Sequence, residues 1–213
     1  MTRKLWLLLA AWAALANPVE AKQWRLYENC SLIANPANDG DSFHVRYNKR
    51  RYLFRLYFVD CPESEDSLPE RVAEQAAYWG LDPKTTVQLG KQAAKFTEKF
   101  LSKRFTVDSK LADAMGRSDK DRDYAIVRVG DQNLAVELVR NGLARIYGVG
   151  VDLPDGTSEK TMWWRLKTAE REAQKMKAGG WGLTAAAGTP PVPLPALAPA
   201  AAAPSTPLTE QSL

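Results

Sequence analysis

The pattern of apolar and polar positions predicts short β-strands near the start of the chain. Alternation is clearest at Phe43, Val45 and Tyr47, which are separated by polar residues. Such alternation is typical of a strand with one buried face. The pattern over residues 42–60 therefore predicts a β-hairpin with a polar turn. A first strand is predicted before it, within residues 23–35.

The later part of the chain mixes helical and strand-like spacing. The predicted elements are helices over 68–81 and 85–104, a strand over 105–111, a strand, turn, short helix and strand over 122–147, and a last helix over 158–182. Three strands, a helix and two more strands predict an α+β domain. This order is compatible with a small five-stranded β-barrel of the OB type.

The two ends of the chain differ from this central segment. Residues 1–21 have a basic start, an apolar stretch and small residues before Ala21, which is the pattern of a secretory signal peptide. The apolar stretch is shorter than the roughly 20 residues that span a bilayer, although an uncleaved anchor stays open as an alternative. Residues 22–183 form the predicted domain, and the Ala/Pro-rich residues 184–213 predict a disordered tail. We expect a secreted or periplasmic protein.

The net charge and the histidine content exclude only a few classes of functional site. The formal net charge of +4 and the pI near 9.0 suit an anionic partner without requiring one. The single histidine, His44, lies in the middle of a predicted strand, where we expect a solvent-facing role. It argues against a His-rich zinc site and against a Ser-His-Asp triad.

The stretch FRLYFVDCPESE places an arginine, Arg55, inside a run of strand-forming residues. A guanidinium group in such a position needs an anionic partner. Asp41 opens one predicted strand and Asp60 closes the next, so antiparallel pairing brings the two carboxylates together. Glu63 follows on the loop. The arrangement is either a structural ion pair at a strand end or a site for a hard cation such as Ca²⁺ or Mg²⁺ together with an anion.

Several separated motifs resemble the staphylococcal (micrococcal) nuclease family. They include NDGDSF, FRLYFVDCPE, AMGRSDKDRDYAIVRV and GGWG, which follow one another in this order over most of residues 24–183. The resemblance implies an OB-type barrel with about three α-helices. It also implies a phosphodiesterase endonuclease that uses Ca²⁺ to cleave DNA and RNA with little sequence specificity. We expect a monomer with nucleic-acid substrates, no stable protein partner and no membrane span after removal of the signal.

The same resemblance implies roles for individual residues. Asp41 and Asp60 would be the metal-binding carboxylates, and the backbone oxygen of Cys61 would be a third ligand, at a position where the family usually has threonine. Glu63 would orient or deprotonate the attacking water. The remaining predicted contacts to substrate are the phosphate-binding Arg55 and Arg117, which are also catalytic, and the base-packing Tyr147.

Two other functions remain open from the sequence. OB barrels also bind nucleic acid without cutting it, so one alternative is a catalytically weak binding module of the same family. Another is a Ca²⁺-stabilised envelope protein attached through its Ala/Pro-rich tail. The complete set of two aspartates, two arginines and a glutamate favours the enzyme, because a pure binding module has no need of it.

The two cysteines, Cys30 and Cys61, leave a structural question open. In the barrel that the resemblance implies, their two segments run near each other, and an exported protein meets oxidising conditions. A disulfide and two separate thiols are therefore both compatible with the sequence.

Overall fold

The structure is a computed structural model that describes residues 23–114 and 122–187. The predicted signal peptide and the predicted phosphate ligand Arg117 lie outside the described residues. The predicted tail also lies outside them, except for its first four residues, which continue the last helix to Ala187. Within the described part of the chain, no helix combines the length and the apolar character that crossing a bilayer requires.

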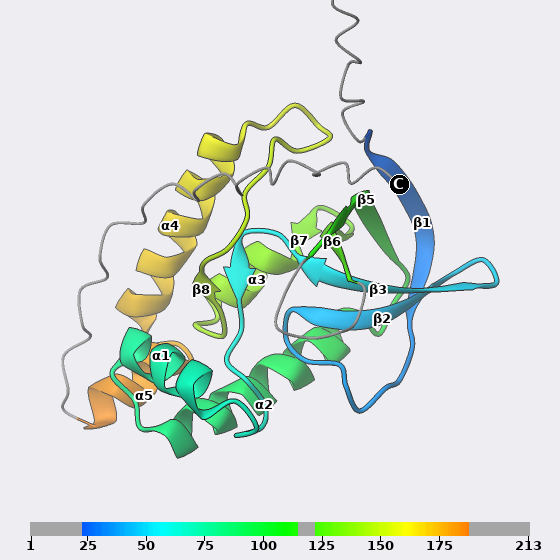
Figure 1. The fold of residues 1–213 in the computed structure, drawn as a ribbon. Helices are drawn as coiled ribbons and strands as arrows, with labels where there is room; N and C mark the ends of the chain where they lie inside the picture. The colour runs from blue at the N-terminus through cyan, green and yellow to red at the C-terminus, as the bar shows by residue number, and fades with distance from the viewer. Residues whose placement is uncertain (1–22, 115–121, 188–213) are drawn as a thin grey trace, which may run out of the picture.

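A closed, mixed β-barrel forms the centre of the fold (Figure 1). The strands of its sheet are β1 (Arg25–Leu32), β2 (Ser42–Tyr47), β3 (Arg50–Leu56), β5 (Phe105–Asp113), β6 (Asp123–Val129) and the short β7 (Gln132–Asn133). Their order is β3-β2-β1-β5-β6-β7, and a parallel pairing of β3 with β6 closes five of them into the barrel. This confirms the predicted α+β class and OB-type barrel.

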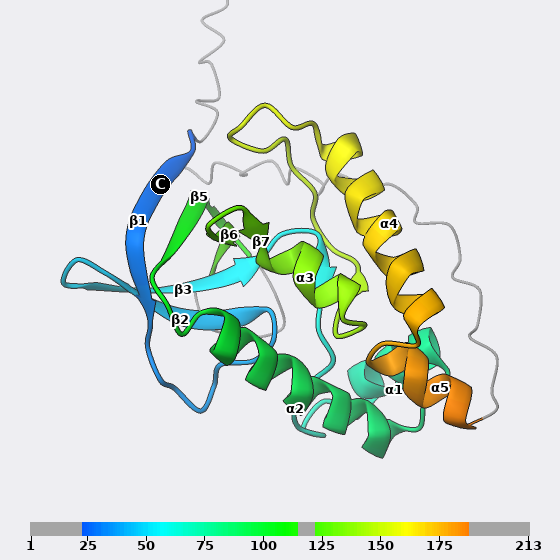
Figure 2. The ribbon, with the colours of Figure 1, turned by 180° about the vertical axis from the view of Figure 1, so that it is seen from behind.

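Helices cover one side of the barrel and leave the β2–β3 turn projecting on the other (Figures 1 and 2). They are α1 (Pro69–Trp79), α2 (Pro83–Phe100), α3 (Leu134–Arg140), α4 (Glu159–Met176) and α5 (Gly180–Ala187). The described residues thus hold five helices, where about three were expected. The pattern did not predict α5, because its sequence, GWGLTAAA, has no polar face to mark a helix.

The predicted hairpin ends earlier than its apolar run. The strand was expected to continue to Asp60, but β3 ends at Leu56, and Phe58 adopts a left-handed φ of 71°. Such a conformation is costly for a bulky residue, and it turns the Phe58 ring toward Trp163 of α4, with centroids 5.6 Å apart. The chain then forms the short β4 (Val59–Asp60), which pairs with β8 (Arg145–Ile146). Asp60 therefore sits between the barrel and the helices.

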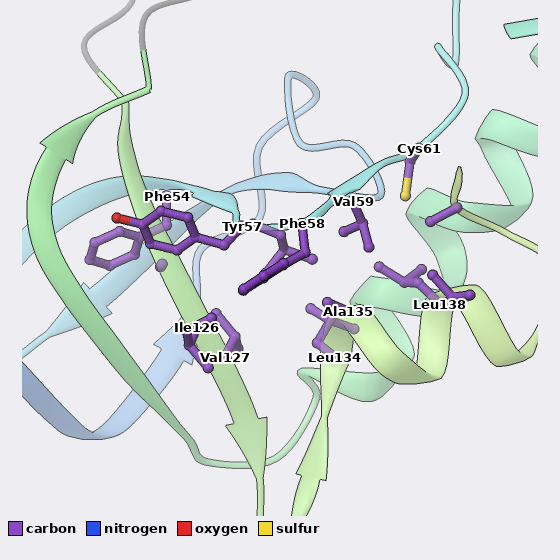
Figure 3. Packing of buried hydrophobic residues seen from close by; sticks show 14 of the residues in the cluster. Phe54, Tyr57, Phe58, Val59, Cys61, Ile126, Val127, Leu134, Ala135 and Leu138 are labelled. Carbon is purple, nitrogen blue, oxygen red and sulfur yellow. The ribbon is translucent and has the colours of Figure 1, made fainter. Parts of the chain in front are cut away.

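The hydrophobic core continues from the barrel into this junction. Figure 3 shows Phe58 and Val59 facing Leu134 and Leu138 of α3. Helix α2 packs just as closely against the loop after β4: a Cβ added at Gly90 would lie 2.2 Å from the backbone oxygen of Glu63. Only glycine permits this approach, so the position of the Glu63 loop is fixed by backbone packing.

The two cysteines are free and buried, and they do not form a disulfide. Cys30 lies on β1 opposite Phe105 of β5, and its thiol contacts the backbone oxygen of Tyr27. Cys61 instead packs against Gly40, in the loop before β2. Burial raises the pKa of the Cys30 thiol to about 11 and that of Cys61 well above its ordinary value. Both thiols therefore stay protonated at neutral pH.

Candidate functional site

Strand pairing brings an arginine and two aspartates together where β2 begins. Ser42 is the register partner of Arg55, so the preceding residue, Asp41, lies beside the end of β3. The Arg55 guanidinium is 2.8 Å from Asp60 Oδ1 and 3.5 Å from Asp41 Oδ2. The charge of Asp41, supported by that of Asp60, raises the pKa of Arg55 despite the opposing effect of burial. Arg55 is therefore permanently charged.

Asp60 is completely buried, and its carboxylate is surrounded by donors. Besides Arg55, it accepts from Arg71 of α1, from Arg145 Nε of β8 at 2.9 Å and from Gln75 Nε2 at 3.0 Å. Burial by itself raises the pKa of Asp60, but the three guanidinium groups outweigh burial and lower the pKa. Both carboxylate oxygens are engaged, and the four donors come from three different elements.

Asp41 accepts hydrogen bonds from a backbone N–H and from a hydroxyl group. Its Oδ2 accepts from the backbone N–H of Cys61 at 2.8 Å and its Oδ1 from the Ser42 hydroxyl at 3.1 Å. The preceding Asp39 accepts from the backbone N–H groups of Asp41 and Ser42. Burial, followed by the nearby Asp41 charge, raises the pKa of Asp39 well above its ordinary value. The closeness of the two carboxyl groups thus favours the protonated form of Asp39.

Glu63 points toward the same region from the loop that follows β4. Its backbone N–H donates to Gln75 Oε1 at 2.9 Å, and its carboxylate pairs with Arg71. Burial raises the pKa of Glu63, Arg71 acts to lower it and Asp41 acts to raise it, with a net upward shift. The Glu63 side chain is 25% exposed, so water and substrate can reach it.

A cleft of about 330 Å³ opens over this cluster. Its charged wall includes Arg55, Glu63, Arg71 and Arg122, and the remaining lining is mostly polar. Arg122 Nη1 donates to the Ser42 hydroxyl at 3.3 Å. A phosphate group entering the cleft would meet three guanidinium groups and the carboxyl groups of Asp39, Glu63 and Glu65. Guanidinium groups match phosphate oxygens in geometry and charge.

The structure places Tyr147, the predicted base contact, next to this cluster. Its side chain is 40% exposed, and the Arg145 guanidinium lies 4.2 Å from its ring centroid. Tyr147 does not line the cleft. A role in base packing therefore stays a prediction, as does the phosphate-binding role of Arg117.

Three residues that engage Asp60 were missed by the sequence analysis. Arg71 and Gln75 are four residues apart on α1, a spacing that places them on one helix face. The spacing of the two residues could be seen in the sequence, but their contact with Asp60 could not. Arg145 reaches Asp60 only because β8 pairs with β4, which places the two residues opposite each other.

The predicted calcium ligands are already engaged. Asp60 is saturated by its four donors, and the backbone oxygen of Cys61 accepts from Gln75 Nε2 at 3.0 Å. Within residues 23–114 and 122–187, no three acidic, histidine or cysteine side chains are grouped so that they could hold a metal ion. With Arg71 in this position, these residues do not fit Ca²⁺. Arg71, which bridges Asp60 and Glu63, occupies the position of a cation and would have to leave before one could bind both carboxylates.

The fold is a β-barrel with a cleft whose guanidinium groups suit a phosphate ligand. A family profile described as staphylococcal nuclease homologue matches residues 53–182, which is more than half of the 213-residue chain. The chain therefore belongs to the staphylococcal nuclease homologue family, a family of hydrolases that act on nucleic acids. The matched segment contains Arg55, Asp60 and Glu63.

We predict that Arg145→Ala destabilises the fold by about 3 kcal/mol, because breaking a buried ion pair leaves its partner charge uncompensated. The matched control is Arg140→Ala, which removes an exposed arginine paired with Glu137 and Glu172 and should cost about 1 kcal/mol or less. Urea unfolding followed by circular dichroism measures both. Equal losses in the two variants would show that Asp60 does not depend on Arg145.

Proposed function

We propose that the protein is an exported, calcium-dependent nuclease that hydrolyses phosphodiester bonds in DNA and RNA with little sequence specificity. Membership of the nuclease family supports hydrolysis of nucleic acid, and export rests on the leader-like residues 1–21. The observation that carries the proposal is the placement of Arg55 and Glu63 on the wall of one cleft. A fixed cation stabilises the charge that develops on the phosphate, and a reachable carboxylate can accept a proton from the attacking water.

Arg55 supplies the electrostatic part of the reaction. Hydrolysis builds negative charge on the non-bridging phosphate oxygens, and a preorganised cation aimed at them lowers the barrier. Asp41 and Asp60 hold the Arg55 guanidinium in place, so little reorganisation is needed when the phosphate arrives. Arg122 on the same wall adds a second cation, and Arg117 is proposed as a further phosphate ligand.

Glu63 supplies the proton-transfer part. A carboxylate that accepts a proton from water as it attacks phosphorus must be ionised and within hydrogen-bond reach of that water. Its raised pKa makes Glu63 a stronger base than an ordinary glutamate. Its pairing with Arg71 limits this role, because the guanidinium occupies part of the carboxylate.

That pairing is the specific observation that favours a second function. Arg71 pairs with both Glu63 and Asp60 and neutralises part of their negative charge. A site with its carboxylates paired in this way suits phosphate binding better than catalysis. A nucleic-acid-binding module with weak catalysis is therefore the second candidate.

The decisive experiment is cleavage of plasmid DNA, single-stranded DNA and RNA with Ca²⁺ or with EGTA. Glu63→Gln and Arg55→Lys should each lower the rate by about two orders of magnitude or more. The matched control is Glu65→Gln, which removes an exposed carboxylate at the same cleft and should leave the rate within about twofold. Strong cleavage in EGTA contradicts calcium dependence, whereas binding without cleavage under any condition identifies the binding module.

The pH dependence provides an independent check on Glu63. Because the base must be deprotonated, kcat/KM should be high above the pKa of Glu63 and fall as the pH drops through it. Burial places this acid limb above the ordinary pKa of glutamate. Arg71→Gln should move the limb to higher pH, since Arg71 lowers that pKa. A limb that stays in place in this variant would assign the titration to another group.

We also predict that Arg71→Gln tightens Ca²⁺ binding about tenfold, which corresponds to about 1.4 kcal/mol for removal of a competing ion pair. Isothermal titration calorimetry measures the affinity without reference to activity. Arg122→Gln is the matched control, since it removes one positive charge from the same cleft without freeing a carboxylate described here. The same gain in both variants would reflect general electrostatics and would contradict competition by Arg71.

A further inference from the structure

The outer face of the β2–β3 hairpin is continuous with the cleft. Strand alternation places every second residue of β2 on this face, and the register gives their partners on β3. The resulting hairpin strip consists of the cross-strand pairs Ser42–Arg55, His44–Leu53 and Arg46–Arg51. The opposite face carries Phe43, Val45 and Phe54, which are fully buried.

The inner part of the hairpin strip is already a wall of the cleft. Ser42, His44, Leu53 and Arg55 all line it. His44 is held by Asn38, whose Oδ1 accepts from the His44 backbone N–H at 2.9 Å and lies 2.7 Å from the ring Nδ1. A chain that enters the cleft therefore meets the strip directly, since the two share these four residues.

The outer part of the strip is a pair of arginines that face each other. Arg46 and Arg51 are direct register partners, and both are exposed. Like charges opposite each other in a sheet are destabilising. Neither forms an ion pair with any residue that the structure describes. Lys49 and Arg50 at the adjoining turn are exposed as well, and the sequence has no acidic residue between Asp41 and Asp60.

The length of the strip suits a polymer. At about 3.3 Å per strand residue, Arg46 lies about 13 Å along β2 from Ser42, which equals the axial length of about four stacked nucleotides. The turn beyond it projects on the side of the barrel away from α4 (Figures 1 and 2). Nothing in the described helices covers this side in either view.

We propose that Arg46 and Arg51, assisted by Lys49 and Arg50, form a substrate-extension site that binds the phosphate backbone of a nucleic-acid strand several nucleotides from the phosphate held at Arg55. The inference rests on the proposed function for the identity of the polymer. An anion bound between Arg46 and Arg51 would relieve their repulsion. The site reads charge and spacing only, so it adds affinity for long strands without adding sequence preference.

The test measures the affinity of the protein for single-stranded DNA in EGTA. Binding is then measured independently of any cleavage. A fluorescent single strand of about 16 nucleotides is compared with one of about three nucleotides by anisotropy over a range of NaCl concentrations. In the variant Arg46→Gln/Arg51→Gln, affinity for the long strand should fall about five- to twentyfold near 0.1 M NaCl. The slope of log K against log[NaCl] should fall by about 1.4, or about 0.7 for each lost phosphate contact. Affinity for the short strand should not change.

Two comparison variants complete the design. Arg46→Lys/Arg51→Lys keeps the charges and should retain most of the salt slope. Lys160→Gln/Lys175→Gln removes two exposed charges from α4 and should change affinity less than about twofold, because α4 lies away from the strip. The melting temperature of the Arg46→Gln/Arg51→Gln variant should stay unchanged or rise, since a repulsive pair is removed.

Three results would overturn the proposal. Equal losses of affinity in the hairpin and α4 variants would show that only net charge matters. Equal losses of affinity for the long and the short strand would show that the two arginines act on the phosphate in the cleft itself. The third is unchanged oligonucleotide binding together with lost sedimentation on phosphatidylglycerol vesicles, which would make the hairpin a membrane contact. If the protein binds long strands as predicted but never cleaves, the extension site stands and the nuclease proposal fails.

Discussion

A buried carboxylate, that of Asp60, is the interaction on which the rest of this site depends. An isolated ionised carboxylate in a protein interior costs several kcal/mol, so it persists only with excellent compensation. Here the compensation comes from β3, α1 and β8 through Arg55, Arg71 and Arg145. The charge therefore ties the barrel to the helices, and the orientation of Arg55 toward the cleft follows from it.

The same contacts stabilise the site but oppose the proposed catalysis. Arg71 pairs with both Asp60 and Glu63, which stabilises the site but occupies the carboxylates that the proposed cation and attacking water would use. Its side chain is 22% exposed, in contrast to 5% for Arg145. Arg145 is thus built into the core of the site, whereas Arg71 lies at its rim. At the rim a cation could displace Arg71, and a phosphate could compete with the two carboxylates for it.

The barrel also determines which way the outer face of the β2–β3 hairpin points. Alternation along β2 and β3 buries one face of the hairpin and turns the other toward solvent, and that outer face joins the cleft to the exposed arginine pair. The proposed nuclease would gain affinity from such a strip without contacts to bases, because phosphates are the same in every sequence. The repulsion between Arg46 and Arg51 is understandable in these terms.

The sequence by itself determined most of the order of strands and helices, because this order follows from local periodicity, and the resemblance to a known family implied the OB-type barrel. The predicted convergence of Asp41, Arg55 and Asp60 is also found, although Asp60 lies on β4 and not at the end of β3. The sequence also supported the family through separated motifs. Only the tertiary structure decided that the apolar run breaks at Phe58, that the cysteines are apart and that Arg145 reaches Asp60. These features arise from contacts between segments far apart in the chain, where packing overrides local pattern, and no periodicity in the sequence encodes which donors will surround a buried charge.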